Sequence, residues 1–130
     1  MNLINNLIQI KNINNETFDF DNKLSLNNSL LIKNCYNLKI TVINKINKII
    51  IENSHQILIT VQRLIVGLDI SKSKYILLNL DSFTGVLDNQ SLIPFIELFR
   101  SDLYLVGFKE KYRDIKISLQ LSNLYEVDNL

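Results

Sequence analysis

The sequence contains a repeat with a period of nineteen residues. Residues 32–42 return as residues 51–61, and a third copy occupies residues 70–80. In all three copies the first, seventh, ninth and eleventh positions are apolar. Apolar residues that alternate with period two lie on one face of a β-strand. A short, constant period of strand-like segments predicts a solenoid, in which the copies stack and residues at equivalent positions lie above one another.

Looser copies extend the repeat in both directions. One begins at Ile10, at a spacing of 22, and another begins at Ile96, at a spacing of 26 with one extra residue before Leu103. The coils therefore start near Ile10, Ile32, Ile51, Ile70 and Ile96. We predict an all-β fold, a parallel β-helix of short coils that occupies about residues 10–107. Residues 1–130 form a single domain in this interpretation, since a chain of this length matches one domain.

Two columns of polar or small residues mark the turns between strands. The third position of successive coils holds Asn12, Asn34, Asn53 and Lys72. Asparagine tolerates the left-handed backbone of a tight turn, so we expect a stacked ladder rather than a row of ligands. The next position holds Cys35, Ser54 and Ser73 and requires a small, partly buried side chain. This placement predicts that Cys35 is a packing thiol and not a nucleophile.

A helix is the rival interpretation of one segment. Ile43, Ile46 and Ile50 fit the helical spacing i, i+3, i+7, with Lys45 and Lys48 facing water. Three copies at constant spacing with period-two alternation favour strands instead.

The tail of the chain follows a different pattern. A charged connector at residues 108–113 precedes a segment, 114–121, that alternates strictly. The apolar residues predicted on one face of this segment are Ile115, Ile117, Leu119 and Leu121. Because the last coil of a solenoid has an exposed edge, a C-terminal strand or hairpin at about 108–124 is expected either to cap its own chain or to be exchanged with a second copy.

Composition excludes several classes of partner. The formal net charge is +1, and no basic stripe interleaves with aromatic residues, so we expect no nucleic-acid binding. Asn or Lys interrupts every hydrophobic stretch and the N-terminus lacks the pattern of a signal peptide, so we expect no membrane contact. A single cysteine allows no internal disulfide, which indicates a reducing, cytoplasmic location.

The sequence offers little catalytic chemistry. His55 is the only histidine, which excludes a histidine metal cluster, and its column predicts an exposed side chain beside a turn. The three glycines are far apart and form no phosphate loop. Asp81 and Asp88 lie in the enlarged gap between coils and are best interpreted as solvated turn residues. We therefore predict no enzyme activity, no metal and no cofactor.

The motif Ile-x-Asn-Cys at 32–35, repeated as Ile-x-Asn-Ser at 51–54, precedes alternating strands. With this pattern, residues 24–121 resemble the superfamily that contains the C-terminal domain of adenylyl cyclase-associated protein and tubulin-folding cofactor C. The resemblance implies a right-handed β-helix. In the cofactor C branch it would imply a GTPase-activating protein with an arginine finger. Alignment on Ser71 and Lys72 places Gly67 where that arginine is expected, and Arg63 substitutes only with a shift of four residues.

The cyclase-associated branch fits better, because residues 67–73 resemble its late coil and the tail resembles its C-terminal hairpin. This resemblance implies a non-catalytic module that binds actin monomers, promotes their nucleotide exchange, and forms a homodimer by exchange of the C-terminal strand. In that dimer the four apolar residues of the tail would form the interface.

Exposed residues of the coils are the candidates for partner contact. The candidate contact residues are Lys39, Thr41, Thr60, Lys72 and Lys74. Leu58 and Leu77 share the outward eighth position and indicate an interface patch or a surface buried beneath the tail. Two other functions stay open at this point, a structural β-solenoid assembly subunit, for example of a virus, and a GTPase-activating protein that uses Arg63.

Overall fold

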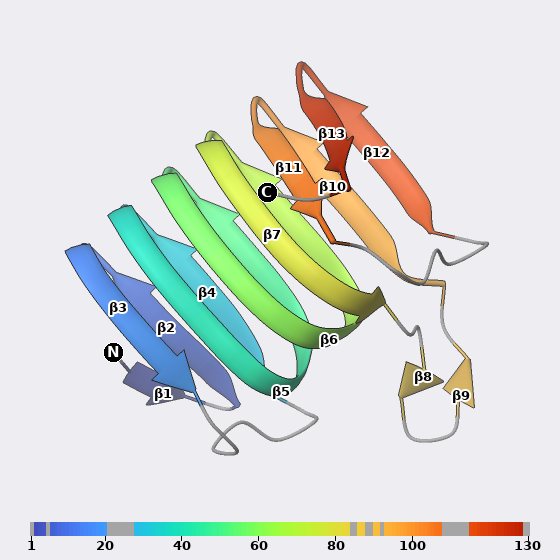
Figure 1. Ribbon diagram of the computed structural model, residues 1–130, viewed down its shortest axis with the longest axis horizontal. Coiled ribbons are helices and arrows are strands. Elements are labelled where there is room, and N and C mark those ends of the chain that lie inside the picture. The colour runs from blue at the N-terminus through green and yellow to red at the C-terminus, as the bar shows by residue number, and fades with distance from the viewer. Residues whose placement is uncertain are drawn as a thin grey trace.

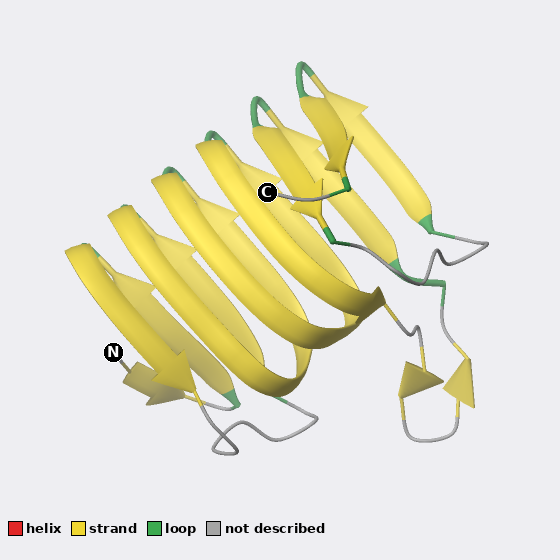
Figure 2. Cartoon of the chain, viewed as in Figure 1, coloured by secondary structure: helices red, strands yellow, loops and turns green. Residues whose placement is uncertain are grey.

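The fold is a parallel β-solenoid of about five turns. The computed structural model describes residues 2–4, 6–20, 28–83, 86–87, 90–91, 93–107 and 115–128. These residues contain strands and turns and no helix (Figure 2). The all-β solenoid predicted from the repeat is confirmed. The helical interpretation of residues 43–50 is wrong, because this segment continues a strand that runs from Tyr36 to Glu52.

The strands stack as layers, and each layer contributes one strand to each of two facing sheets (Figure 1). The first sheet contains β2 (Leu7–Lys11), β4 (Ser29–Lys33), the second halves of β5 (Tyr36–Glu52) and β6 (His55–Ser71), β10 (Phe95–Phe99) and β12 (Lys116–Gln120). The second sheet contains β3 (Asn14–Phe20), the first halves of β5 and β6, β7 (Lys74–Phe83), β11 (Asp102–Val106) and β13 (Asn123–Val127). Three short strands lie outside the stack: β1 (Asn2–Ile4), β8 (Val86–Leu87) and β9 (Gln90–Ser91).

The two edges of the solenoid are built differently. At one edge a tight turn joins the two strands of a layer, whereas at the other edge β5 and β6 bend continuously from one sheet into the next (Figure 1). The bend in β5 coincides with register shifts between Val42 and Lys45 and between Ile46 and Lys48. Bulges of this kind increase the local twist and bend a strand.

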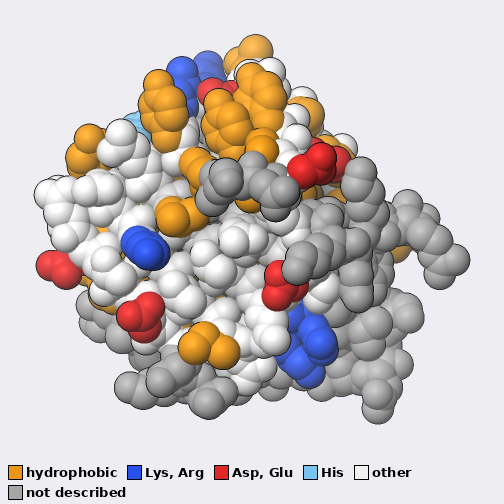
Figure 3. Space-filling model, viewed as in Figure 1, with side chains coloured by type: hydrophobic (Ala, Val, Ile, Leu, Met, Phe, Trp, Pro, Cys, Tyr) orange, Lys and Arg blue, Asp and Glu red, His pale blue; other side chains and the backbone are white. Residues whose placement is uncertain are grey.

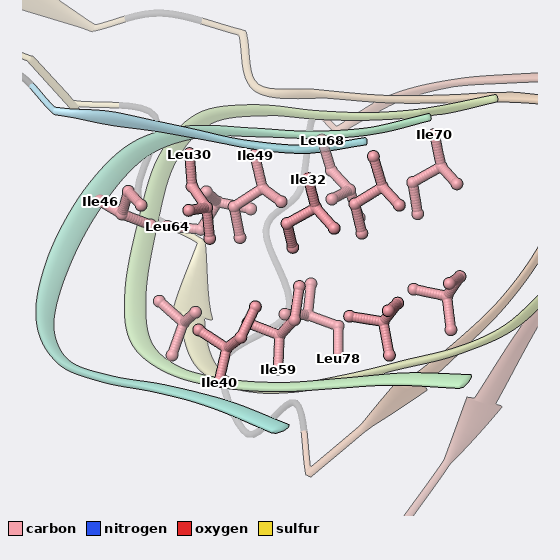
Figure 4. Close-up of a cluster of buried hydrophobic side chains, with 14 of the residues drawn as sticks. Leu30, Ile32, Ile40, Ile46, Ile49, Ile59, Leu64, Leu68, Ile70 and Leu78 are labelled. Atoms are coloured by element: carbon pink, nitrogen blue, oxygen red, sulfur yellow. The ribbon is translucent and has the colours of Figure 1, made fainter. Parts of the chain in front are cut away.

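The core is the space between the two sheets. Two rows of branched aliphatic side chains face each other there, and Ile46 and Leu64 close the row at the curved edge (Figure 4). In each column like lies over like: Ile40 pairs in register with Ile59, which pairs with Leu78. These side chains are fully or almost fully buried. Each contributes about 1.5–3 kcal/mol by leaving water, so the repeat itself supplies the driving force for stacking.

The asparagine column forms the predicted turn ladder. Asn12, Asn34, Asn53 and Lys72 all have left-handed backbone, with φ between 46° and 56°. The Asn53 side-chain amide donates a hydrogen bond of 2.8 Å to the Oδ1 atom of Asn34. This bond ties one turn to the next, so the asparagines serve the scaffold.

The Cys/Ser column forms a second ladder, and it is longer than the sequence predicted. The N–H of Cys35 donates to Ser54 Oγ, the N–H of Ser54 to Ser73 Oγ, and the N–H of Ser73 to Ser101 Oγ, at 3.0–3.1 Å. The last step runs from the N–H of Ser101 to Ser122 Oγ. Cys35 begins this ladder, is buried, and donates its thiol to backbone carbonyls, which confirms its packing role.

In the fifth layer the structure differs from the predicted alignment of the repeat. Leu98, not Ile96, pairs in register with Ile70, so the spacing is 28 residues and not 26. Leu103 nevertheless pairs with Ile76. Therefore one residue is missing from the turn of this layer, whereas the repeat pattern predicted one extra residue there.

The described part of the tail forms a further layer of the solenoid. β12 pairs in parallel with β10, and β13 pairs in parallel with β11 of the same chain. Ile117 and Leu119 continue the inward columns, while Ile115 packs partly against the core. Leu121 departs from the expected common face, because it lies in the turn with φ of 52° and is 79% exposed. The predicted connector at residues 108–113 lies outside the described residues, as does Asp114 at the start of the alternating segment.

Candidate protein-binding site

A shallow groove lies on the outward face of the second sheet. It spans the first halves of β5 and β6 and the start of β7, and its volume is about 350 Å³. The groove is lined by Asn37, Leu38, Lys39, Gln56, Ile57, Leu58, Tyr75 and Leu77. A hollow of this size accommodates one or two side chains of a partner and lies at the lower limit of small-molecule pockets.

One wall of the groove consists of bulged residues. Asn37, Gln56 and Tyr75 occupy the sixth position of their coils, and each has φ of 57° or 58°. The register skips these residues in every pair of strands. Each bulge is one residue that these coils all have between the same two inward positions, so neighbouring strands keep their register, and its side chain lines this wall. Asn37 also donates a hydrogen bond of 2.8 Å to the Oδ1 atom of Asn15 in the layer before it.

The floor of the groove belongs to an outward column that crosses the whole sheet. In register, this column contains Lys39, Leu58, Leu77, Tyr104 and Tyr125. The rings of the two tyrosines stack with their centroids 4.8 Å apart. Figure 3 shows hydrophobic side chains gathered on this face near the turns of β7, β11 and β13. Apolar groups exposed together on one face are typical of a protein-interaction surface.

The structure brings three of the five predicted contact residues to this face. Lys39 is exposed and lines the groove, and it is the single charged residue among the lining residues. Thr41 and Thr60 pair in register in the next outward column and are half-buried. Lys74 is exposed at the turn end of β7, beside Tyr75, and Lys72 is exposed in the turn itself.

The other residues singled out from the sequence do not join this groove. His55 is exposed next to the turn, as predicted, and its Nδ1 atom accepts a hydrogen bond of 3.3 Å from the N–H of Lys74. Arg63 is exposed on the curved edge, in register with Lys45. Asp81 is exposed near the end of β7, and Asp88 lies outside the described residues.

Gly67 has a structural reason to be glycine. A Cβ atom at this position would lie 2.3 Å from the ring of Phe95, which pairs with Gly67 in register. The ring therefore covers the glycine. Lys48 pairs in register with Gly67 from the other side, and its Nζ atom lies 5.2 Å from the centroid of the Phe95 ring.

The described residues provide neither a metal site nor a membrane-spanning helix. No group of three or more His, Cys, Asp or Glu side chains among them could hold a metal ion. Nor does that part of the chain include a helix with the length and apolar character needed to cross a bilayer.

The bulged wall and the two stacked tyrosines were not predicted from the sequence. A signal for the bulges was present, because the fourth and seventh positions of a coil are both inward although only two residues lie between them. Strict alternation cannot place both inward, so one residue between them must bulge. Tyr104 pairs in register with Leu77, but only the two leucines of this outward column were selected from the sequence.

These features define a class: a short-coil β-solenoid domain whose exposed sheet face, rather than an internal cleft, carries the candidate site. The family model described as adenylate cyclase associated (CAP) C terminal matches residues 1–87. The chain therefore belongs to the CAP C-terminal family, whose members are generally non-catalytic domains that bind actin monomers.

A solved structure supports the same fold. The chain is similar to the cyclase-associated protein from Cryptosporidium parvum, with a TM-score of 0.74 and 18% sequence identity. The match covers 93% of this chain and 69% of the other. At this identity the similarity establishes the fold alone. None of the curated proteins matches the chain.

Proposed function

We propose that this chain is a non-catalytic module that binds actin monomers through the groove on its second sheet and promotes their nucleotide exchange. Membership of the CAP C-terminal family supports actin as the partner. The observation that carries the proposal is the groove itself, where Lys39, Leu58 and Leu77 lie side by side on an exposed sheet face. Because actin is a cytoplasmic protein, the proposal also places the chain in the cytoplasm.

The chemistry of the groove suits a protein partner. Leu58 and Leu77 offer an apolar floor, and Tyr75, which is 62% exposed, offers an aromatic wall. Exposed aromatic side chains over an apolar floor are typical of the residues that dominate protein interfaces. Lys39 adds a positive charge at the end of the floor, which favours a partner segment that pairs an acidic group with an apolar one.

The predicted contact residues extend this surface. Thr41 and Thr60 lie one column away from the floor and can supply hydrogen bonds at its rim. Lys74 and Lys72 lie at the turn edge, next to Tyr75, and add positive charge there. Charges at the rim of an interface mainly guide association and specificity.

The proposed active form is a homodimer that associates through the C-terminal layer. Ile117 is 49% exposed and Leu119 is 45% exposed, although both occupy columns that are buried in the layers below. The outer edges of β12 and β13 pair with no other described strand. A second copy would cover these apolar side chains and pair these edges, whether by exchange of the strand or by end-to-end contact.

The experiment is titration of the chain into fluorescently labelled actin monomers. We expect micromolar or tighter binding, and we expect Lys39→Glu to weaken it about tenfold because the substitution reverses the charge of the groove. Lys11→Glu is the matched control, because Lys11 is exposed on the opposite sheet and pairs in register with Lys33. This control should bind like the wild type.

Two results would count against the proposal. An unmodified chain that fails to bind at micromolar concentration would refute the actin function. Equal binding by Lys39→Glu and by the wild type would show that actin contacts another surface.

A further inference from the structure

The two ends of the solenoid differ in how far the inward side chains of their terminal layers are covered. At the N-terminal end β1 pairs antiparallel with β2 and lies against the first layer (Figure 1). Ile8 is 5% exposed and Ile10 is completely buried, although both belong to that first layer. At the C-terminal end the corresponding inward residues, Ile117 and Leu119, are about half exposed. The N-terminal end is therefore sealed over β2, whereas the C-terminal end is open over β12.

The other strand of the first layer, β3, has no such cover among the residues that the structure describes. β3 pairs with β5 on one side and with no described strand on the other. An unpaired edge of this length is a template for a strand from another molecule. Unlike the edge of β2, this edge is protected by no described strand, so the side chains of β3 are the described groups that can protect it.

Glu16 provides that protection. It pairs in register with Leu38, so it occupies a column that continues through Ile57 and Ile76 and is apolar in every later layer. Glu16 is exposed only because its layer is the first. An inward-directed charge on an edge strand opposes further stacking, because stacking would bury the carboxylate in an apolar column without a partner.

The turn ladder gives a second, independent mismatch. In successive layers each ladder N–H donates to the hydroxyl of the following layer, ending at Ser122. A copy stacked head to tail would present its first turn to Ser122, and the ladder position of that turn is Ile13, whose backbone carbonyl bonds to Tyr36. Ile13 has no hydroxyl to accept the bond. The same arrangement would place Leu124 of one copy against Glu16 of the next.

We propose that the first layer is a stop against end-to-end growth, with Glu16 as its principal residue, so that copies of this chain associate only through their C-terminal ends. Contact between two identical C-terminal ends is isologous and closes at a pair, whereas head-to-tail contact would continue into a fibre. This inference builds on the homodimer proposed above and adds the reason why association of copies ends there.

The test compares Glu16→Leu with Thr17→Leu by light scattering over a range of protein concentrations. Both substitutions add a leucine to β3, but Thr17 pairs with Lys39 and points outward, so only the first opens the inward column. We expect Glu16→Leu to raise the weight-average mass by about twofold or more as concentration increases, because each new contact joins whole assemblies. The mass of Thr17→Leu should match that of the wild type.

The masses of the two variants decide whether Glu16 stops end-to-end growth. Growth of Glu16→Leu alone supports the stop, whether the wild type is a dimer or a monomer. An unchanged mass for Glu16→Leu, or equal growth of both variants, overturns it. The mass of the wild type reports separately on the proposed dimer, so failure of one proposal is distinguishable from failure of the other.

Discussion

The serine ladder leads to a sharp prediction for Ser73→Ala. Ser73 is completely buried, and its Oγ atom accepts a bond of 3.0 Å from the N–H of Ser54. The same hydroxyl donates to the carbonyl of Ser71, which also accepts a bond from the N–H of Asn53. Without the Ser73 hydroxyl, the carbonyl of Ser71 still accepts the bond from Asn53, but the N–H of Ser54 has no acceptor.

The magnitude follows from that one orphaned donor. A buried donor without a partner costs about 1–3 kcal/mol, so we expect Ser73→Ala to lower the free energy of unfolding by about 2 kcal/mol. For 130 residues this corresponds to a fall in the melting temperature of about 7 °C. Ser122 makes the same two kinds of bond, to the N–H of Ser101 and the carbonyl of Gln120. Its side chain is partly exposed, so water can replace the hydroxyl and Ser122→Ala should cost only about 0.5 kcal/mol.

Urea denaturation monitored by circular dichroism measures both variants. We expect the midpoint to fall clearly for Ser73→Ala and slightly for Ser122→Ala, with the slope m unchanged in both. Equal losses in the two variants would refute the reasoning, because the bonds are alike and only burial differs. A loss below the error of the measurement for Ser73→Ala would refute it as well.

Two further predictions concern Phe95 and the C-terminal layer. Gly67→Ala should lower the free energy of unfolding by about 1 kcal/mol, because its Cβ atom must displace the Phe95 ring, and the loss should nearly vanish in a Phe95→Ala background. Urea denaturation of the wild type, the two single variants and the double variant measures the effect, and an equal loss from Gly67→Ala with and without Phe95 would contradict it. Leu119→Lys should convert the proposed dimer to a monomer in light scattering, because it places a charge in the open apolar column. Ser118→Lys, on the opposite face of the same strand, should keep the wild-type mass, and a dimer that survives Leu119→Lys would exclude this interface.

The layers that follow the nineteen-residue repeat closely were predicted correctly from the sequence. Ile40, Ile59 and Leu78 stack as their shared position requires, because a column of branched aliphatic side chains leaves each strand one favourable register. The turn columns were predictable for the same reason, since only a few residue types tolerate left-handed backbone or a buried, hydrogen-bonded position. Asn34 meets the first requirement and Ser54 meets the second, and both positions recur with the period of the repeat.

The later layers were harder to align because the turn changes length. The first four turns contain a bulged residue, such as Tyr75, and the fifth turn lacks it. A fixed template therefore fits either Leu98 or Leu103, but not both without a gap in the turn. The final layer was difficult for a different reason: Leu121 continues the apolar alternation of β12 in sequence, but its backbone has already entered the turn.

The candidate site was only partly visible in the sequence. Leu58 and Leu77 stood out as apolar residues at outward positions, and Lys39 was selected as an exposed residue of the same strand face. The groove between them depends on the bulges, which set the direction of Gln56 and Tyr75. Its shape arises from backbone geometry that a list of apolar positions does not contain.

The contrast between the two edges has a consequence for how such a chain tolerates inserted sequence. Three of the spacings between coils are longer than nineteen residues, and their extra residues lie where the chain crosses between the sheets at the curved edge. The longest of these crossings lies between Phe83 and Phe95. Lengthening a loop there costs little, since each doubling of loop length adds about 0.6 kcal/mol of closure entropy. An insertion in the turns would instead separate Asn34 from Asn53 and break both ladders. The long crossing between Phe83 and Phe95 is thus the place on the curved edge where a peptide epitope or a fluorescent reporter can be grafted while the stacked layers and the groove stay intact.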